Sequence, residues 1–314
     1  MTRFVVCGET LIDLVQSSTD TPTSFRSTWE ALSAGGPMNS AVALGTLGAQ
    51  AQFLGRLSTD AFGRQLREHV EGAGVGLDLA TVSPQATSIA VVSLDEQGVA
   101  SYTFHFEDTA NFGWQVEELP TLADDDWLHI ASLSCVVDPG AEVLLGWAEG
   151  VRSGVSYDIN VRPTVITDPQ AYWGKVEPWL RAVGGRQGIV KASDADIDFL
   201  AQALGGGDPV DVAAGWVEQH GLGLAVVTLG ADGAVAVEPG GAVTRVPGFA
   251  TDVVDTVGAG DTFMAGFLEG RVRQGLDLEE SLRRGAAAAS IVCSRQGAQP
   301  PTADEVDALI AARR

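Results

Sequence analysis

The amino-acid sequence predicts an α/β protein with a mainly parallel central sheet, helices on both faces and a small β lid. Two observations support this fold class: short apolar runs alternate with stretches of helical periodicity, and one segment sets two strands side by side without a helix between them. No Pro/Ser-rich linker, charge block or internal repeat divides the 314 residues. We therefore expect one domain spanning 1–314.

The expected strands of the central sheet are rich in Val, Ile, Leu and Phe. They are FVVC (4–7), AQFLGRL (51–57), WLHIAS (127–132), GVSYDIN (154–160), GIVKAS (188–193) and LAVVTLG (224–230). Helical patterns separate most of them, among them PMNSAVALGTLG, in which Pro37 suits a first turn, TDAFGRQLREHVEG and AEVLLGWAEGV. This alternation is typical of parallel strands joined by helices.

The lid is expected from TSIAVVSLDEQGVASYTFHF (87–106), which forms two alternating strands around a Glu-Gln-Gly turn. An antiparallel hairpin does not belong in the middle of a parallel sheet, so we expect a flap at the sheet edge covering about 87–110. The segment after the first strand, about 15–28, adds to this flap. An ordinary antiparallel edge addition is the alternative.

Charge and composition exclude several classes of partner. Lys and Arg total 19 against 41 acidic residues, and the net charge of −22 repels nucleic acid and anionic membrane. No segment approaches the roughly 20 apolar residues of a membrane span, and the first apolar run is too short for a signal peptide. Cys7, Cys135 and Cys293 form no CxxC motif, and the four histidines show no metal spacing. We expect a cytoplasmic protein.

The stretch DTVGAGDTFMAGFLEG (255–270) carries the strongest chemical signal. Its large apolar residues fall on one helical face, which predicts a helix that begins near Ala259. Gly258 and Gly260 then lie at the N-terminus of this helix, where free N–H groups and the helix dipole attract an anion. Asp261 would repel a bound phosphate, so its useful role is to accept a proton from a hydroxyl that attacks phosphorus. The alternative is that Asp261 only complements the dipole.

A second glycine-rich stretch, SAGGPMNSAVALGTLG (33–48), also precedes a helix. Gly35 and Gly36 would let a sugar ring lie against the backbone, and the amide of Asn39 can donate to and accept from a polyol. The alternative is a plain helix start in which Asn39 is a local cap.

Two further segments end strands with candidate residues. GETLIDL (8–14) puts Asp13 at the carboxyl end of the first strand, where open α/β sheets bind ligands, or else in a solvated loop. VTLGADGA (227–234) ends a strand in a glycine-rich turn, which could be only a tight hairpin.

The usual motifs of other enzyme classes are missing. The chain has no GxxxxGK[ST], no GxGxxG opening a helix after the first strand, and no GxSxG. These absences argue against a P-loop NTPase, a dinucleotide-binding enzyme and a serine hydrolase.

Taken together and in this order, the segments resemble the ribokinase-like (PfkB) family of carbohydrate kinases over essentially the whole chain. The matching pieces are GETLIDL, AGGPMNSAVALGTLGA, FLGRLSTDAFG, YDINVRP, VKASDADI, VTLGADGA, DTVGAGDTFMAGFLEG and SRQGAQPP. The resemblance implies one α/β domain with a small β lid, phosphorylation of a sugar from ATP with Mg²⁺, a helper cation such as K⁺, and a homodimer formed through the lid.

The resemblance also implies roles for individual residues. Asp261 resembles the catalytic base, and Gly258, Ala259 and Gly260 resemble the anion hole. The implied sugar-binding set is Asp13, Gly35, Gly36, Asn39, Phe104 and Arg162. The implied nucleotide set is Lys191, Thr228, Gly230 and Gly233. The implied monovalent-cation set is Asp255 with carbonyls near Val257, Val292, Arg295 and Gly297.

Four residues depart from the family pattern. Ser193 and Asp196 stand where many relatives carry Asn and Glu, which bears on Mg²⁺ positioning. His105 and Asn111 stand where such sugar kinases often show Tyr and Asp, which bears on the acceptor.

The expected function is transfer of the γ-phosphate of ATP to a sugar hydroxyl. GETLIDL resembles the start of bacterial fructokinases and of 2-keto-3-deoxygluconate kinases more than that of nucleoside kinases, so a keto sugar is favoured, and fructose first among them. Kinases of 2-keto-3-deoxygluconate, ribose or a nucleoside are alternatives, and aromatic residues on the lid hairpin would stack on a nucleoside base. From another class, a non-catalytic sugar- or nucleotide-binding regulator would be expected to lack Asp261.

Overall fold

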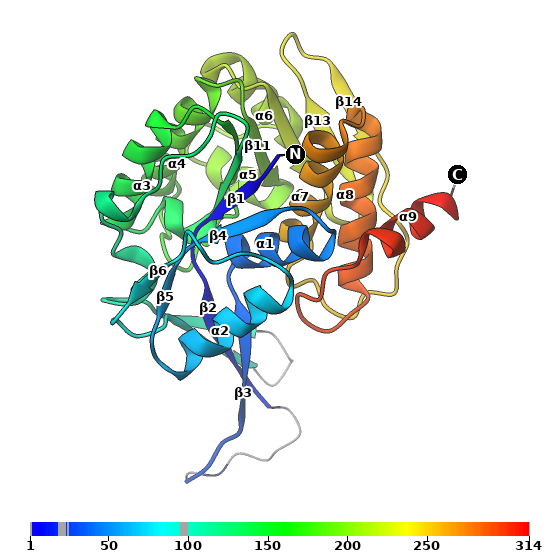
Figure 1. Ribbon diagram of the computed structural model, residues 1–314. Helices are drawn as coiled ribbons and strands as arrows, with labels where there is room; N and C mark the ends of the chain where they lie inside the picture. The colour runs from blue at the N-terminus through cyan, green and yellow to red at the C-terminus, as the bar shows by residue number, and fades with distance from the viewer. Residues whose placement is uncertain (1, 18–22, 24, 95–99, 314) are drawn as a thin grey trace.

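The computed structural model describes residues 2–17, 23, 25–94 and 100–313, and its main sheet has eight strands (Figure 1). In spatial order these are β14 (Val243–Val246), β13 (Ala234–Val237), β12 (Leu224–Thr228), β11 (Ile189–Ser193), β10 (Gly154–Asp158), β9 (Trp127–Ala131), β1 (Phe4–Cys7) and β4 (Ala51–Leu54). Pairing is parallel from β4 through β12, and β13 and β14 complete one edge in antiparallel fashion. The predicted fold class is confirmed.

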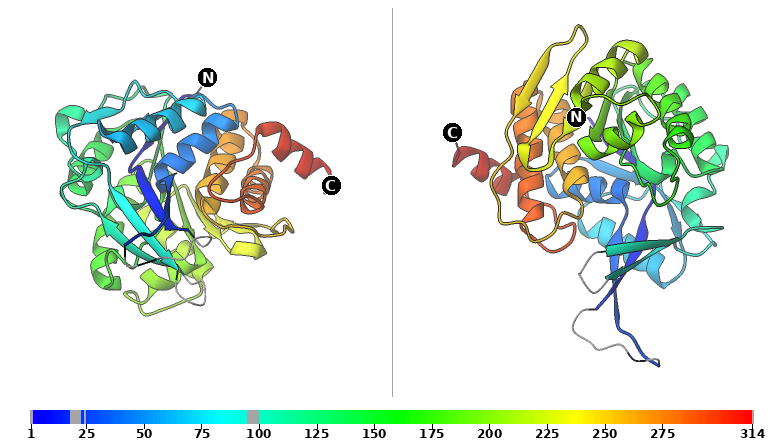
Figure 2. Two further views of the ribbon diagram at one scale, coloured as in Figure 1. Left: turned by 90° about the horizontal axis from the view of Figure 1, so that it is seen from below. Right: turned by 180° about the vertical axis from the view of Figure 1, so that it is seen from behind.

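Helices cover both faces of this sheet (Figure 2). One face carries α1 (Gly36–Thr46), α2 (Ala61–Gly72), α7 (Ala259–Leu268), α8 (Leu278–Cys293) and α9 (Ala303–Ala311). The other carries α3 (Gly140–Gly150), α4 (Pro169–Gly184), α5 (Asp194–Ala201) and α6 (Pro209–His220). No helix in these described ranges is long and apolar enough to cross a membrane.

Strand β1 explains why the chain needs both helical layers. Its four residues are fully buried, and successive side chains of a strand point to opposite faces. Phe4 and Val6 pack into the core under α1 and α7, whereas Val5 and Cys7 pack into the core under α3 and α4. A strand that is apolar at every position therefore requires cover on each face.

The lid is a second sheet of four strands, ordered β3 (Trp29–Ala34), β2 (Leu11–Gln16), β7 (Ile89–Leu94) and β8 (Ala100–His105). Strands β7 and β8 form the antiparallel hairpin expected from the sequence, β2 and β3 also pair antiparallel, and β2 pairs with β7 in parallel. The sheet projects away from the main body (Figure 1). The expected Glu-Gln-Gly turn falls within 95–99, and these residues, like 18–22 and 24 of the first lid segment, lie outside the described residues.

One expected strand is divided. Instead of a single strand over 51–57, β4 ends at Leu54 and β5 (Arg56–Ser58) pairs with β6 (Thr81–Ser83) in a separate two-stranded sheet. Gly55 separates the two strands, and a Cβ there would lie 2.2 Å from the Phe53 ring. Buried Arg56 then finds its acceptors outside the main sheet, on Gln85 and Glu118.

Candidate active site

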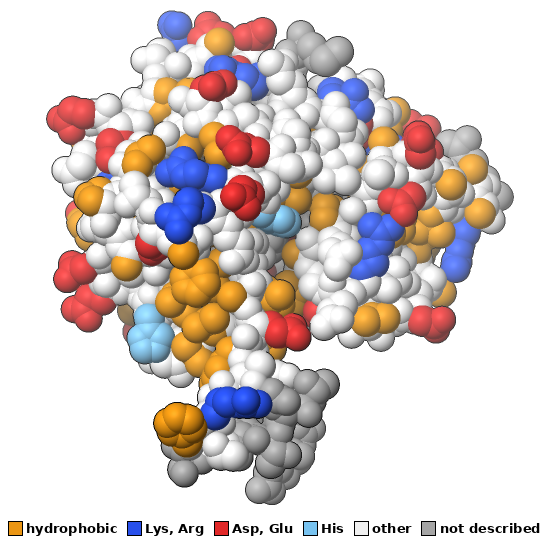
Figure 3. Space-filling view, turned by 60° about the horizontal axis from the view of Figure 1, so that its bottom comes forward, with side chains coloured by type: hydrophobic (Ala, Val, Ile, Leu, Met, Phe, Trp, Pro, Cys, Tyr) orange, Lys and Arg blue, Asp and Glu red, His pale blue; other side chains and the backbone are white. Residues whose placement is uncertain are grey.

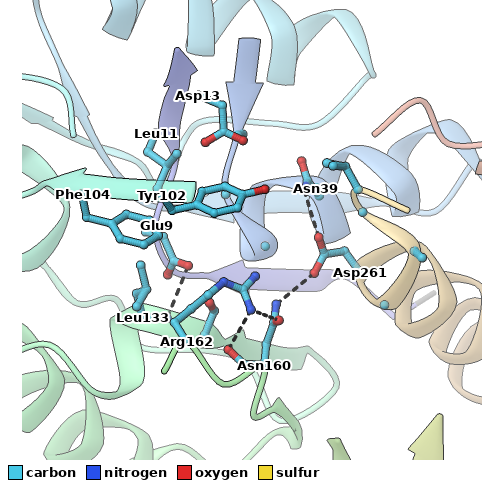
Figure 4. A pocket seen from close by; sticks show the side chains of 18 of the residues that line it. Glu9, Leu11, Asp13, Asn39, Tyr102, Phe104, Leu133, Asn160, Arg162 and Asp261 are labelled. Carbon is cyan, nitrogen blue, oxygen red and sulfur yellow. Dashed lines mark hydrogen bonds between the residues drawn. The ribbon is translucent and has the colours of Figure 1, made fainter. Parts of the chain in front are cut away.

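A pocket of about 400 Å³ opens between the lid, the N-termini of α1 and α7, and loops that follow strands β1, β9 and β10 (Figure 4). These three strands are parallel neighbours, so their carboxyl ends meet at one edge of the sheet. The predicted residues that line the pocket are Asp13, Gly35, Gly36, Asn39, Phe104, Arg162, Val257, Gly258, Ala259, Gly260 and Asp261.

The N-terminus of α7 faces this pocket. The helix begins at Ala259, as predicted, and Gly258 precedes it with a left-handed φ of 75°. No side chain among the described residues caps this terminus. The Ala259 N–H already donates to the Thr256 carbonyl at 3.2 Å. The N–H groups of Gly260 and Asp261 have no carbonyl one turn earlier in the helix to donate to. They are therefore better placed to donate to a bound anion.

Asp261 lies in the first turn of α7, is 6% exposed, and holds its carboxylate between two amides. Asn39 Nδ2 donates to one oxygen at 2.9 Å, and Asn160 Nδ2 approaches the other at 3.4 Å. Burial raises the pKa of Asp261 above its ordinary value, while the Asn39 hydrogen bond and the Lys191 and Arg162 charges act in the opposite direction. A carboxylate whose pKa rises toward neutral is a stronger proton acceptor.

Asn39 does not act as a local cap, contrary to the simpler alternative from sequence. Gly35 is the N-cap of α1, and the Asn39 amide reaches across to Asp261. Its Oδ1 is buried and has no hydrogen-bond partner among the described residues. A buried acceptor left open at a pocket wall is suited to a ligand hydroxyl.

Gly35 and Gly36 are needed for the approach of protein groups to each other. Gly35 has φ of 124°, and a Cβ there would lie 2.7 Å from the Glu9 carbonyl oxygen. A Cβ on Gly36 would lie 2.8 Å from Asn160 Nδ2 and 3.1 Å from Asp261 Oδ1. The start of α1 can therefore lie close to the Asp261 carboxylate only because these positions lack side chains.

Asp13 lies elsewhere than expected. The sequence predicted it at the carboxyl end of the first strand, but β1 ends at Cys7 and Asp13 lies within lid strand β2, paired with Leu32 and Ala90. From the lid its carboxylate faces the pocket (Figure 4). Burial raises the pKa of Asp13 to about 6, against a lowering contribution from the Arg162 charge.

Aromatic rings of lid strand β8 line the pocket on the same side. Tyr102 and Phe104 are stacked with ring centroids 6.2 Å apart. Across the pocket, Arg162 Nη1 donates to three uncharged oxygens, including Asn160 Oδ1 at 2.5 Å. The pocket thus combines an apolar wall with convergent polar groups, which is the usual composition of a small-molecule site.

The residues implied for the nucleotide are not among those lining the pocket. Lys191 is buried, and its Nζ donates to both carboxylate oxygens of Asp158 at 3.0 and 3.1 Å. A Cβ on Gly260 would lie 2.7 Å from that Nζ, so the charge of Lys191 sits beneath the start of α7. Thr228, Gly230 and Gly233 occupy the tight turn joining β12 to β13, which is the hairpin named as the simpler alternative.

The loops implied to hold a monovalent cation are joined to each other. Asp255 accepts from the Val257 N–H (3.0 Å) and the Gly297 N–H (2.9 Å), and the Cys293 carbonyl accepts from the Asp255 N–H. The Val292 carbonyl accepts from the Arg295 N–H at 3.0 Å. Asp255 is thus brought beside the implied segment that follows α8. Within the described ranges, no group of three or more His, Cys, Asp or Glu residues could hold a metal ion.

The departures from the family pattern mostly serve the protein's own structure. Ser193 and Asp196 form a capping box at the start of α5, and Asp196 also accepts from the Val161 N–H at 2.8 Å. Asn111 is buried and bonds to the backbone of Thr10, away from the pocket lining. His105 ends strand β8.

Two of the pocket residues outside the predicted set, Glu9 and Asn160, make hydrogen bonds that shape the site. Glu9 is buried and accepts from the N–H and hydroxyl of Ser134, which holds the 3₁₀ turn Ser132–Cys135 at the pocket floor. Asn160 bonds to both Arg162 and Asp261. Both lie inside quoted motifs, GETLIDL and YDINVRP, and a polar residue just beyond a buried strand is the signal that could have identified them.

Comparison with known proteins gives the same assignment over nearly the whole chain. The model of the pfkB family of carbohydrate kinases matches residues 1–305. A fructokinase of Rhizobium leguminosarum bv. trifolii is 35% identical over 265 residues, covering 83% of this chain and 77% of the relative.

Two solved structures extend the likeness to the fold. A fructokinase from Xylella fastidiosa with bound ATP superposes with a TM-score of 0.84 at 28% identity, covering 99% of this chain and 98% of the other. A fructokinase from Vibrio cholerae with bound fructose, ADP and calcium superposes with a TM-score of 0.82 at 25% identity, covering 98% and 99%.

Proposed function

The chain belongs to the PfkB family of carbohydrate kinases, and we propose that fructose is the sugar to which it transfers the γ-phosphate of ATP. The observation that carries the proposal is the placement of buried Asp261 at the open N-terminus of α7, with its carboxylate fixed by Asn39. This arrangement puts a proton acceptor and phosphate-binding N–H groups at one point of the pocket wall.

In the proposed reaction a sugar hydroxyl gives its proton to Asp261 while its oxygen attacks the γ-phosphorus. The new oxygen–phosphorus bond forms as the bond to the β–γ bridging oxygen breaks, and ADP leaves. The N–H groups of Gly260 and Asp261 face the charge that develops on the transferred phosphoryl, with the Lys191 ammonium beneath them. Phosphoryl transfer of this kind depends mainly on positioning and charge stabilisation.

For Mg²⁺ the residues at 193 and 196 do not fit as ligands, because the Asp196 oxygens already accept backbone N–H groups from Val161 and Ser193. We propose that Mg²⁺ is held through the nucleotide phosphates and water, as this ion commonly is. For K⁺ the backbone carbonyls beside Asp255 are the better ligands, because the two Asp255 oxygens also accept backbone N–H groups, from Val257 and Gly297. Asp255 would add negative charge next to these carbonyls, and K⁺ bound there would fix the loop before α7.

The charges lining the pocket favour a neutral sugar. The pocket lining contains three acidic side chains and one basic side chain, namely Glu9, Asp13 and Asp261 against Arg162. A neutral polyol can pair with Asp13 and with the open Oδ1 of Asn39, whereas a sugar acid would face net negative charge. Arg162 is the observation that favours a second candidate, a sugar acid such as 2-keto-3-deoxygluconate, since the acceptors of its guanidinium among the described residues are all uncharged.

The test is an ADP-release assay with fructose, ribose, adenosine and 2-keto-3-deoxygluconate. We expect the highest kcat/KM for fructose, and expect Asn39→Ala to raise the KM for fructose more than the KM for ATP. Arg152→Ala, a change at an exposed arginine in the loop between α3 and β10, is the matched control for Arg162→Ala. Preferential turnover of the sugar acid, lost in Arg162→Ala alone, would replace fructose by that acceptor.

We also propose a cytoplasmic homodimer formed through the lid. Leu32 and Tyr102 on the lid are 41% and 44% exposed, and hydrophobic side chains gather on the face seen from the lid side (Figure 3). Leu32→Lys should shift the sedimentation of the protein to that of a monomer, and Val116→Lys, at an exposed valine outside the lid strands, should not. Monomeric wild-type protein would contradict the dimer.

A further inference from the structure

Asn160 has an unusual backbone for a residue with a side chain. It follows strand β10 with φ of 45°, in the left-handed region that costs most residues roughly 1 kcal/mol or more. Its neighbours are fastened on both sides, because the Ile159 N–H donates to the Lys191 carbonyl (3.0 Å) and the Val161 N–H donates to Asp196 (2.8 Å). Asn adopts this region more readily than most residues, and its fastened neighbours fix the direction of its side chain at the pocket wall.

The side chain of Asn160 joins two groups that the proposed reaction uses (Figure 4). Its Oδ1 accepts from Arg162 Nη1 at 2.5 Å, and its Nδ2 lies 3.4 Å from Asp261 Oδ1. Because an amide has a distinct donor end and acceptor end, the bond to Arg162 forces the donor end toward Asp261. The second contact, at 3.4 Å, lies at the long end of hydrogen-bond distances.

Gly36 provides independent support for this contact. A Cβ at position 36 would lie 2.8 Å from Asn160 Nδ2 and 3.1 Å from Asp261 Oδ1, so it would enter the space between them. The start of α1 therefore leaves room for Asn160 and Asp261 to meet.

We propose that Asn160 is a positioning residue. It holds the second oxygen of Asp261 and the guanidinium of Arg162 in one fixed arrangement, so that this carboxylate and this cation contact the same sugar molecule. This inference rests on the proposed kinase function, and it adds a residue outside the set that the sequence indicated. Asn39 holds the other oxygen of Asp261, so the two amides together set the plane of the carboxylate.

The charged groups that face Asp261 come from three neighbouring elements. They are Lys191 on β11, Asp158 on β10, and Arg162 in the loop after β10. Arg162 is itself bonded to Asn160, so its position changes in a variant that lacks an acceptor at 160. The titration of Asp261 is therefore best read in a variant that keeps an acceptor for Arg162.

Two variants distinguish a positioning role of the Asn160 side chain from a role in folding. Asn160→Gly removes both contacts and tolerates the left-handed backbone, so it should lower kcat while the KM for ATP stays unchanged. Asn160→Asp also tolerates this backbone and keeps an acceptor for Arg162, but it turns a carboxylate toward Asp261. Two carboxylates in contact raise the pKa of one of them, so the acid limb of the kcat/KM profile should move to higher pH by about one unit or more.

Gln187→Gly is the matched control, since Gln187 also has a positive φ (50°) and is exposed in the turn before β11. It should leave kcat and the pH profile unchanged. An acid limb that stays in place in Asn160→Asp, in a variant with wild-type thermal stability, would overturn the inference while leaving the kinase assignment standing. A wild-type protein that phosphorylates no sugar in the panel would instead refute the proposed function.

Discussion

Replacing Asp261 with asparagine tests the centre of the proposed mechanism with almost no change in shape. The carboxylate is 6% exposed and contacts the amides of Asn39 and Asn160. An asparagine can keep the Asn39 bond through its own oxygen, but it cannot take a proton from the sugar hydroxyl. A positioned general base contributes on the order of 10² to 10⁴ in rate, equal to about 3 to 5 kcal/mol of transition-state stabilisation.

The same substitution should not lower stability at neutral pH. Burial raises the pKa of Asp261 above its unfolded value, although Asn39, Lys191 and Arg162 oppose this rise. A group with a raised folded pKa binds its proton more tightly in the folded state. Its stabilising contribution is therefore present at low pH and is lost as pH rises through the folded pKa. Asp261→Asn removes a buried charge above that pH, so the Tm should be equal or higher at pH 7, with a gain that shrinks on acidification.

The assay measures kcat by ADP release and Tm by thermal unfolding on the same samples. Asp126→Asn is the matched control. Asp126 precedes β9, whose other end faces the pocket, and it pairs with Arg3 at 2.6 Å. Although burial acts to raise it, hydrogen bonds from Arg3 and the Ala123 N–H hold the pKa of Asp126 below its ordinary value. The control should lose Tm at neutral pH and keep kcat. A kcat for Asp261→Asn within about threefold of wild type would exclude Asp261 as the base, since it falls far short of the expected loss.

Three further perturbations address the glycine turn, the cation loop and the lid. Gly35→Ala should lower the free energy of unfolding by about 2 kcal/mol or more, because its Cβ would lie 2.7 Å from the Glu9 backbone. Gly48→Ala, with φ of 79° and nothing within 4 Å of its Cβ, should lower it by only about 1 kcal/mol. Equal losses in the two variants would contradict the predicted clash at Gly35. Rates in K⁺ should exceed those in Na⁺ and in a bulky organic cation, and Asp255→Ala should remove the difference; equal wild-type rates in all three would exclude the cation site. Because burial holds the pKa of Asp13 near 6, the KM for sugar should rise as pH falls below about 6, when the carboxyl becomes protonated and loses an acceptor. A KM that rises equally in Asp13→Asn would assign that dependence to another group.

The fold class could be predicted from the sequence because it depends on patterns that repeat within a few residues. The six expected strands appear in the main sheet, four of them shorter by one or two residues at an end, and α7 begins at Ala259 as its periodicity indicated. The exception is the segment after Leu54, where β5 leaves the main sheet. That departure depends on the acceptors that Arg56 finds on residues far along the chain, which periodicity does not register.

The sequence by itself determined the chemistry at the start of α7, because Asp261 and the glycines around it are close in the chain and belong to one helix terminus. Only the tertiary structure decided what this carboxylate contacts. Its bond to Asn39 spans 222 positions, and its contact with Asn160 spans 101. Likewise, Asp13 faces the pocket because β2 pairs with β7 across the lid, which joins Ile12 to Ile89. Such partners are set by the packing of elements distant in sequence, and a local pattern contains no information about which distant residue a side chain will meet.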